Sequence, residues 1–99
     1  MSSEGLHVPR ERLNAKTYAR HQAIMSLKEE LEAADWYAQR ADDCEDEALR
    51  NVLLHNMREE IEHAAMIVEW LRRNSSDFEK QLRKYVFSEG DIASLEHES

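Results

Sequence analysis

The chain has 99 residues, a net charge of −8 and 41% apolar residues, which fits one small domain with a thin hydrophobic core. So acidic a chain is not expected to bind nucleic acid, which requires a basic surface. Two glycines and one proline argue against a sheet architecture, and the dominance of helix-forming residues predicts an all-α fold. No run of about 18 apolar residues and no signal peptide is present, so neither a membrane span nor secretion is expected. The single cysteine, Cys44, excludes an internal disulfide and fits the cytoplasm.

We expect three regions along the chain. Residues 1–8 form a flexible N-terminal tail, residues 9–90 form a helical hairpin with a short third helix, and residues 91–99 form a flexible C-terminal segment. The first helix starts between Pro9 and Asn14, because proline is tolerated only in a first helical turn.

The first helix is expected to run to Arg40 or Ala41. A polar stretch follows, in which Asp43 or Asp46 can cap the next helix. The remaining expected elements are a second helix over residues 47–73, a polar break over 74–77, a third helix over 78–87 and a short turn over 91–95. Two helices of about 27 residues, each about 40 Å long, make an antiparallel hairpin whose thin core favours association with a second chain.

Residues at three- and four-residue spacing predict the seam between the two long helices. On the first helix they are Ala23, Leu27, Glu30, Ala34, Tyr37 and Ala41. On the second helix they are Leu49, Leu53, Asn56, Glu60, His63, Ile67 and Trp70. With the turn centred near residue 45, Glu30 faces Glu60 and Leu27 faces His63, so polar residues interrupt both lines at one level.

The polar interruption predicts half of a metal site. Glu60 and His63 are three residues apart on one face of a helix, and Glu30 faces them. Burying two carboxylates is costly unless a metal or a partner compensates them. Two chains related by a two-fold axis would supply four carboxylates and two imidazoles in a four-helix bundle, as in di-iron carboxylate proteins. The alternative is that these residues bind no metal and form a polar layer that only fixes the register of the helices in the bundle. We interpret a second Glu-x-x-His spacing, from Glu4 to His7, as chance.

Three segments resemble the encapsulated ferritins, short ferritin-like proteins that are packaged inside encapsulin shells. They are residues 29–37 (EELEAADWY), 55–66 (HNMREEIEHAAM) and 69–73 (EWLRR). The similarity extends from about residue 19 to residue 90. It implies a ferroxidase that oxidises Fe²⁺ to Fe³⁺ at a di-iron centre between two chains of a ferritin-like four-helix bundle.

By this resemblance, Glu30, Glu60 and His63 are the catalytic iron ligands. Glu29 and Glu32 match outer carboxylates that guide ions toward the centre, and Trp36 and Tyr37 match aromatic positions beside that path. Without the resemblance, Glu29, Glu32, Glu59 and Glu62 are interpreted as a solvated helix face, and the aromatic residues as packing residues. Carboxylate and imidazole ligands also accept Ca²⁺, Mn²⁺ or Zn²⁺.

The resemblance also implies partners and a location. The family forms a decamer of five dimers, and its oxidised iron is stored by an encapsulin nanocompartment in the cytoplasm. Family members usually end in an extension that carries a shell-targeting peptide. No such motif follows Gly90 here, so we expect either a truncated chain or another route of loading. Water and peroxide both stay open as by-products. The alternative function is a non-catalytic, metal-stabilised module for helical oligomerisation.

Overall fold

The computed structural model describes residues 5–98, and these residues form helices and turns without a strand. The predicted all-α fold class is therefore confirmed. The chain divides into two compact units, Met1–Val68 and Glu69–Ser99. In chain order the elements are η1 (Arg10–Arg12), α1 (Ala15–Asp43), α2 (Glu47–Asn74), α3 (Ser76–Tyr85) and η2 (Ala93–His97).

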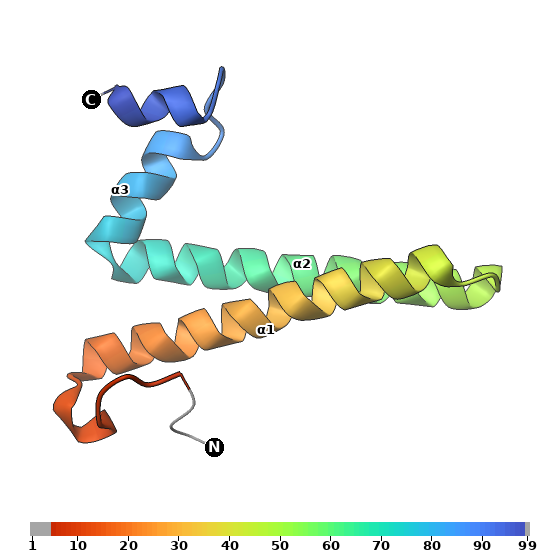
Figure 1. Ribbon diagram of the computed structural model, residues 1–99, viewed down its shortest axis with the longest axis horizontal. Coiled ribbons are helices and arrows are strands. Elements are labelled where there is room, and N and C mark those ends of the chain that lie inside the picture. Colours follow the sequence, from red (N-terminus) through yellow and green to blue (C-terminus); the bar gives the residue numbers. More distant parts are fainter. Residues whose placement is uncertain (1–4, 99) are drawn as a thin grey trace. The chain divides into compact units, whose positions relative to one another are not determined.

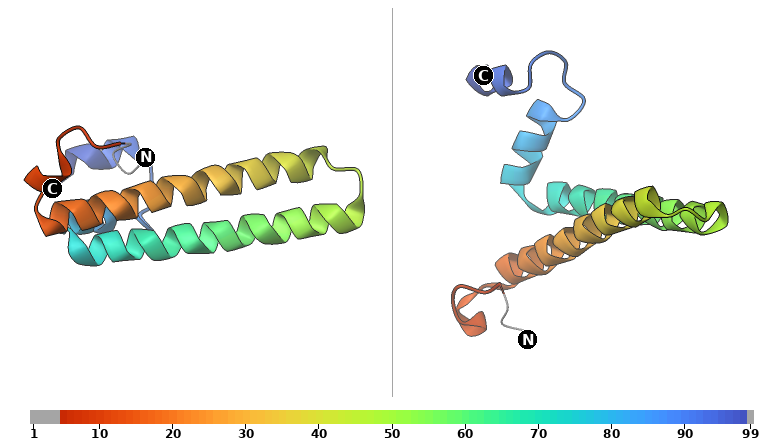
Figure 2. Two further views of the ribbon diagram at one scale, coloured as in Figure 1. Left: turned by 90° about the horizontal axis from the view of Figure 1, so that it is seen from below. Right: turned by 45° about the vertical axis from the view of Figure 1, so that its right-hand side comes forward.

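The first unit is a helical hairpin. Helix α1 and residues 47–68 of α2 lie side by side and run in opposite directions (Figure 1), and the further views show the same pairing (Figure 2). Within residues 5–98, no helix combines the length and the apolar composition that crossing a membrane requires.

Helix α1 begins and ends slightly later than its sequence predicts. Pro9 and the residues after it form the short 3-10 turn η1, and α1 starts only at Ala15. The start is set by Asn14, whose side-chain oxygen accepts a hydrogen bond from the backbone N–H of Thr17 at 2.8 Å. Because neither glycine nor proline interrupts it, α1 continues to Asp43 instead of stopping at Arg40 or Ala41.

The turn between α1 and α2 is fixed by two side chains. Asp46 Oδ1 accepts a hydrogen bond from the backbone N–H of Leu49 at 2.9 Å, so Asp46 is the expected cap of α2. Arg50 donates from Nε and Nη2 to the carbonyl oxygen of Cys44, at 3.1 and 2.6 Å. This guanidinium ties the first turn of α2 to the end of α1 and thereby stabilises the register of the hairpin.

In the second unit, α3 covers Ser76–Tyr85 instead of the expected residues 78–87. It begins earlier because Ser75 caps it, accepting a hydrogen bond from the backbone N–H of Phe78 at 3.3 Å. The expected turn near residue 91 is the 3-10 turn η2. Its start is stabilised by a hydrogen bond that the Ser94 hydroxyl donates to the Asp91 carboxylate at 2.7 Å.

An ion network joins the last turn of α2 to α3 within the second unit. Arg72 donates two hydrogen bonds to the carboxylate of Glu69, both at 2.8 Å, and a third to Glu79. These hydrogen bonds, first of all those with Glu69, raise the pKa of Arg72. The pKa of Glu69 is lowered to about 2, first by Arg72 and then by Arg73.

The hairpin buries small residues at its seam. Ala34 and Ala41 of α1 are buried as predicted, whereas within residues 47–68 of α2 the buried residue is Ala64, next to the expected His63, which is half-buried. Residues chosen at heptad spacing move gradually away from the line of contact between the two helices, because an α-helix turns every 3.6 residues and a heptad repeat assumes 3.5. The expected seam residue Leu49 is accordingly exposed.

Large apolar side chains remain exposed on both helices of the first unit, which is consistent with the thin core that the composition predicts. They include Ile24, Leu31, Trp36, Leu49, Val52, Ile61 and Met66. Residues 1–4 of the predicted N-terminal tail and Ser99 of the C-terminal segment lie outside the described residues, and with them Glu4 of the second Glu-x-x-His spacing.

Candidate metal centre

Three potential metal ligands meet near the middle of the hairpin. Glu30 comes from α1, and Glu60 and His63 come from successive turns of α2. One ligand atom from each residue lies within 4.8 Å of the other two. No other group of three His, Cys, Asp or Glu side chains within residues 5–98 meets this condition. The antiparallel register that the sequence predicts therefore brings its three principal site residues together.

The imidazole of His63 lies between the two carboxyl groups. Its Nδ1 atom is 3.2 Å from Glu30 Oε1 and 3.8 Å from Glu60 Oε2. A cation at this point would be within reach of ligand atoms from all three side chains. The side chains keep 26% (Glu30), 23% (Glu60) and 43% (His63) of their surface exposed, so the group opens toward solvent.

The pKa values of the two carboxyl groups are shifted in opposite directions by their proximity. The pKa of Glu30 is lowered, mainly by its hydrogen bond with the Glu60 carboxyl group and further by His63, against the opposing effect of partial burial. The pKa of Glu60 is raised, because it hydrogen bonds to the neighbouring Glu30 carboxylate and is partly desolvated. The two carboxyl groups therefore disfavour carrying their charges together, and a bound cation would relieve this repulsion.

The chemistry of this donor set fits a first-row divalent metal. Two carboxylates supply hard oxygen ligands and one imidazole supplies nitrogen, a combination that suits Fe²⁺, Mn²⁺ and Zn²⁺. Three ligands from one chain leave coordination positions free, and the exposed side of the group is where a further ligand could approach. The residues present therefore fit the iron site that the sequence predicts, and the metal itself is not identified by the ligands.

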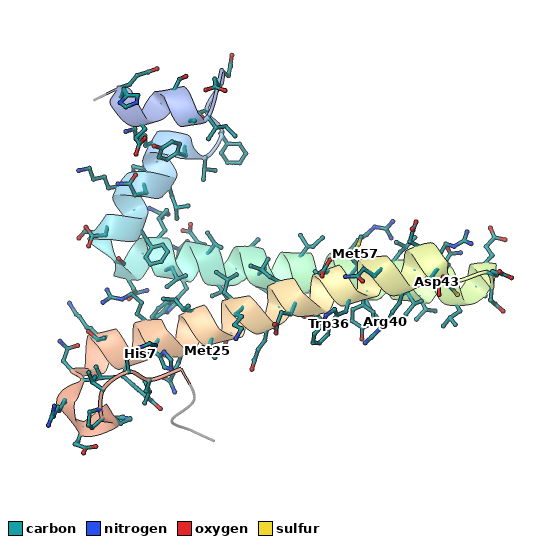
Figure 3. All side chains as sticks on the ribbon, viewed as in Figure 1. His7, Met25, Trp36, Arg40, Asp43 and Met57 are labelled. Carbon is teal, nitrogen blue, oxygen red and sulfur yellow. The ribbon has the colours of Figure 1, made fainter. Side chains whose placement is uncertain are left out.

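The other predicted site residues lie around this group rather than in it. Glu29 and Glu32 are exposed on α1 and do not join the three ligands. Trp36 is 51% exposed, and Figure 3 shows it on the same side of α1 as Arg40. Tyr37 is half-buried, with the Arg40 guanidinium 5.6 Å from its ring centroid.

Sequence reasoning missed Arg50 as a residue that supports the site. Its two hydrogen bonds to Cys44 fix the turn on which the facing of Glu30 and Glu60 depends. An arginine in the first turn of a helix gives no signal of this in the sequence, because its partner is a backbone carbonyl.

Comparisons with known proteins find relatives over nearly the whole chain. The EncFtn-like family profile matches residues 5–89. A protein of Rhodospirillum rubrum named "Encapsulated ferritin-like protein" is 52% identical over 95 residues, which cover 96% of this chain and 68% of that protein. A "Ferritin-like protein" of Thermotoga maritima is 45% identical over 93 residues, covering 94% of this chain and 82% of that protein.

The fold has a close structural match as well. The crystal structure of protein NE0167 from Nitrosomonas europaea superposes with a TM-score of 0.85 and 47% sequence identity, covering 90% of this chain and 98% of that chain. A family profile that matches nearly the whole helical part of the chain, together with relatives of this similarity, indicates a ferritin-like protein that handles iron. The chain therefore belongs to the EncFtn-like family, as its resemblance to the encapsulated ferritins predicts.

Proposed function

We propose that this protein is a ferroxidase that oxidises Fe²⁺ to Fe³⁺ at a centre shared by two copies of the chain. The observation that carries the proposal is the group of Glu30, Glu60 and His63, whose ligand atoms lie within 4.8 Å of one another. Membership of the EncFtn-like family supports iron as the substrate.

A second copy of the chain would complete the centre. One chain offers two carboxylates and one imidazole, and all three side chains keep part of their surface open. Two copies around a two-fold axis offer four carboxylates and two imidazoles, the ligand set of di-iron carboxylate bundles. Four carboxylates also balance the charge of two divalent ions. Some of the apolar side chains exposed on the two helices would be covered in the same association.

The residues of this chain bind and orient the substrate. Glu30 and Glu60 hold Fe²⁺ through oxygen, and His63 holds it through nitrogen. The pKa of Glu60 is raised by its neighbouring carboxylate, and a bound cation would favour the charged form that binds metal. Each Fe²⁺ of a bound pair gives one electron to dioxygen. The protein contributes the short separation and the open coordination positions that this transfer needs.

Residues on α1 would bring iron to the centre. Glu29 and Glu32 are exposed carboxylates one and two positions from Glu30, where they raise the local concentration of cations. Trp36, about two turns further along α1, and the half-buried Tyr37 would flank this path.

The proposed product is delivered to an encapsulin shell for storage. The proposal of an encapsulin partner and compartment rests on the family and on the name of the Rhodospirillum rubrum relative, which describes that protein as encapsulated. We extend it to a homo-oligomer, with the decamer as the expected assembly, because a shared centre requires at least two chains.

The test is oxidation of Fe²⁺ in air, followed by ferric absorbance. We expect the wild type to oxidise Fe²⁺ well above the spontaneous rate, and Glu30→Ala and His63→Ala to fall to that rate. Glu62→Ala is the matched control, because it removes an exposed carboxylate from the same turn of α2 without removing a ligand. Variants that match the wild type would contradict the catalytic assignment.

The same assay separates the ferroxidase from a non-catalytic oligomerisation module. The contact between the two long helices buries few side chains, which favours the oligomerisation module because a second chain would add to the core. A module of that kind would associate when metal is added but would not accelerate oxidation. Light scattering with and without Fe²⁺ under argon measures association independently of turnover.

A further inference from the structure

The segment that precedes α1 folds back over the first turns of that helix. Gly5 of this segment lies against His21 and Met25 of α1, all within the first compact unit. Figure 1 shows the segment beside the N-terminal part of α1, and Figure 3 shows His7 and Met25 at this same end of the helix. An imidazole and a thioether, two groups that can bind a metal, are thereby brought together away from the candidate metal centre.

The side chains of His21 and Met25 flank a single point. Measured from the position that a Cβ atom would take at Gly5, His21 Cε1 is 3.2 Å away and Met25 Sδ is 3.3 Å away. Cε1 is bonded to both ring nitrogens, so the edge of the imidazole that carries the nitrogens faces this point. His21 and Met25 are four residues apart on α1, a spacing that returns to the same face of a helix. One nitrogen donor and one sulfur donor therefore converge beneath Gly5.

The backbone at Gly5 makes this arrangement possible. Its φ is +84°, in the left-handed region that favours glycine, and a Cβ atom there would press on both the ring and the sulfur. The segment is held in place by Arg10, whose guanidinium lies 3.8 Å from the centroid of the Tyr18 ring. The Tyr18 ring in turn lies 6.2 Å from that of His21, centroid to centroid. The position of the two donors is therefore fixed by the fold of the segment onto α1.

Both donors remain available to a ligand. Neither ring nitrogen of His21 makes a hydrogen bond to another residue between Gly5 and Glu98. The side chains of His21 and Met25 are both half-buried, so an ion can reach them from solvent.

The surroundings favour a soft monovalent cation over a hard divalent one. Residues 5–25 contain four arginine or lysine residues and only Glu11 as an acid. Carboxylates, the ligands that hard divalent ions prefer, are therefore scarce here, and the positive charge repels a divalent ion more than a monovalent one. Thioether sulfur is a soft ligand that selects Cu⁺, and imidazole accepts copper as well.

We propose that His21, through a ring nitrogen, and Met25, through Sδ, form a binding site for Cu⁺ beneath Gly5. The site differs from the proposed ferroxidase centre in its ligands, its ion and its position, and one chain is sufficient to form it. Met25 is five residues from Glu30, about 7.5 Å along α1, so neither donor belongs to the iron site.

The test uses Ag⁺ as the probe, because Ag⁺ shares the ligand preference of Cu⁺ and is stable in air. The full chain carries the substitution Cys44→Ser, which removes the only thiol that would compete for the ion. Four methionines give four methyl signals in the NMR spectrum. We expect the Met25 methyl and His21 ring signals to move together and to saturate at one Ag⁺ per chain. Movement of the Met66 methyl signal instead, or shifts of all the methyl signals alike, would overturn the site.

Substitutions of each donor measure its contribution. Met25→Leu and His21→Gln should each lower the Ag⁺ affinity at least about tenfold, because even residues that only orient metal ligands contribute 10–100-fold. Leucine conserves the volume of methionine, so the fold is retained. Met66→Leu and His55→Gln are the matched controls, since both replace exposed residues of α2. An unchanged affinity in Met25→Leu, or equal losses in the controls, would contradict the assignment.

The two proposed sites are tested separately by the oxidation of Fe²⁺ in air. Met25→Leu should lose Ag⁺ binding and oxidise Fe²⁺ at the wild-type rate, whereas Glu30→Ala should lose oxidation and keep Ag⁺ binding. If Met25→Leu lost both, the two sites would not be independent, and the Cu⁺ site as proposed would be wrong.

Discussion

The sharpest test of how the turn supports the metal centre is the substitution Arg50→Ala. In the structure the Arg50 guanidinium donates to the Cys44 carbonyl from two nitrogens, at 3.1 and 2.6 Å. The alanine variant leaves this carbonyl oxygen without its partner at the end of α1. It also removes the only side-chain hydrogen bonds within residues 5–68 that join the first turn of α2 to the end of α1.

The expected cost follows from the type of bond. Hydrogen bonds to a charged donor contribute about 1.5–3 kcal/mol, and the half-buried position of Arg50 places its effect near the lower end. For a domain of this size each kcal/mol shifts the melting temperature by about 4–8 °C. Arg50→Ala should therefore lower the melting temperature by about 6–12 °C. It should also weaken Zn²⁺ binding, because a looser turn relaxes the facing of Glu30 and Glu60 about 20 Å away.

Thermal unfolding followed by circular dichroism measures the first effect, and calorimetric titration with Zn²⁺ measures the second. Arg58→Ala is the control, since Arg58 is an exposed arginine on the same helix and makes no hydrogen bond within the described residues. Arg50→Lys should keep only part of the stability, because an ammonium group cannot donate from two nitrogens of a planar fork. If Arg50→Ala melts and binds metal as Arg58→Ala does, the turn does not control the register.

Two further predictions concern titration. The pKa of Glu69 is lowered to about 2, so its ion pairs stabilise the fold fully above its ordinary pKa of 4.5, and this stabilisation is lost as the pH falls from 4.5 toward 2. Urea unfolding across that range should show the loss in the wild type and a smaller loss in Glu69→Gln; equal losses would contradict the assignment. The pKa of Glu60 is raised and metal binds the carboxylate form, so Zn²⁺ affinity should rise with pH as Glu60 deprotonates, and binding should release a proton. Calorimetry in two buffers of different ionisation enthalpy measures that proton, which Glu30→Gln should diminish; an unchanged proton count would show that Glu60 is not its source.

Much of this fold could be predicted because the rules involved are local. The scarcity of glycine and proline predicts helices, and the polar break at residues 42–46 predicts the turn. The facing of Glu30 and Glu60 follows from a short turn between two straight helices, because the rise per residue is fixed. The three ligands could thus be brought together from the sequence alone.

The errors arose where tertiary packing or a single side chain decides. On α2, Ala64 is buried more deeply than the expected His63, because the choice between adjacent positions depends on how the two helices rotate against each other. Helix α3 starts earlier than expected because Ser75 outcompetes the following residues as its cap. Arg50 could not be identified because its partner is a main-chain atom, which leaves no trace in a pattern of side chains.

The most direct test of the shared centre is anomalous diffraction from crystals of the wild type grown with Fe²⁺ under argon. We predict two iron ions between two copies of the chain, about 3.5–4 Å apart, as in other two-metal centres. Each copy should contribute Glu30, Glu60 and His63. Iron bound by ligands from one chain alone, or iron elsewhere on the surface with these three side chains free, would contradict the account.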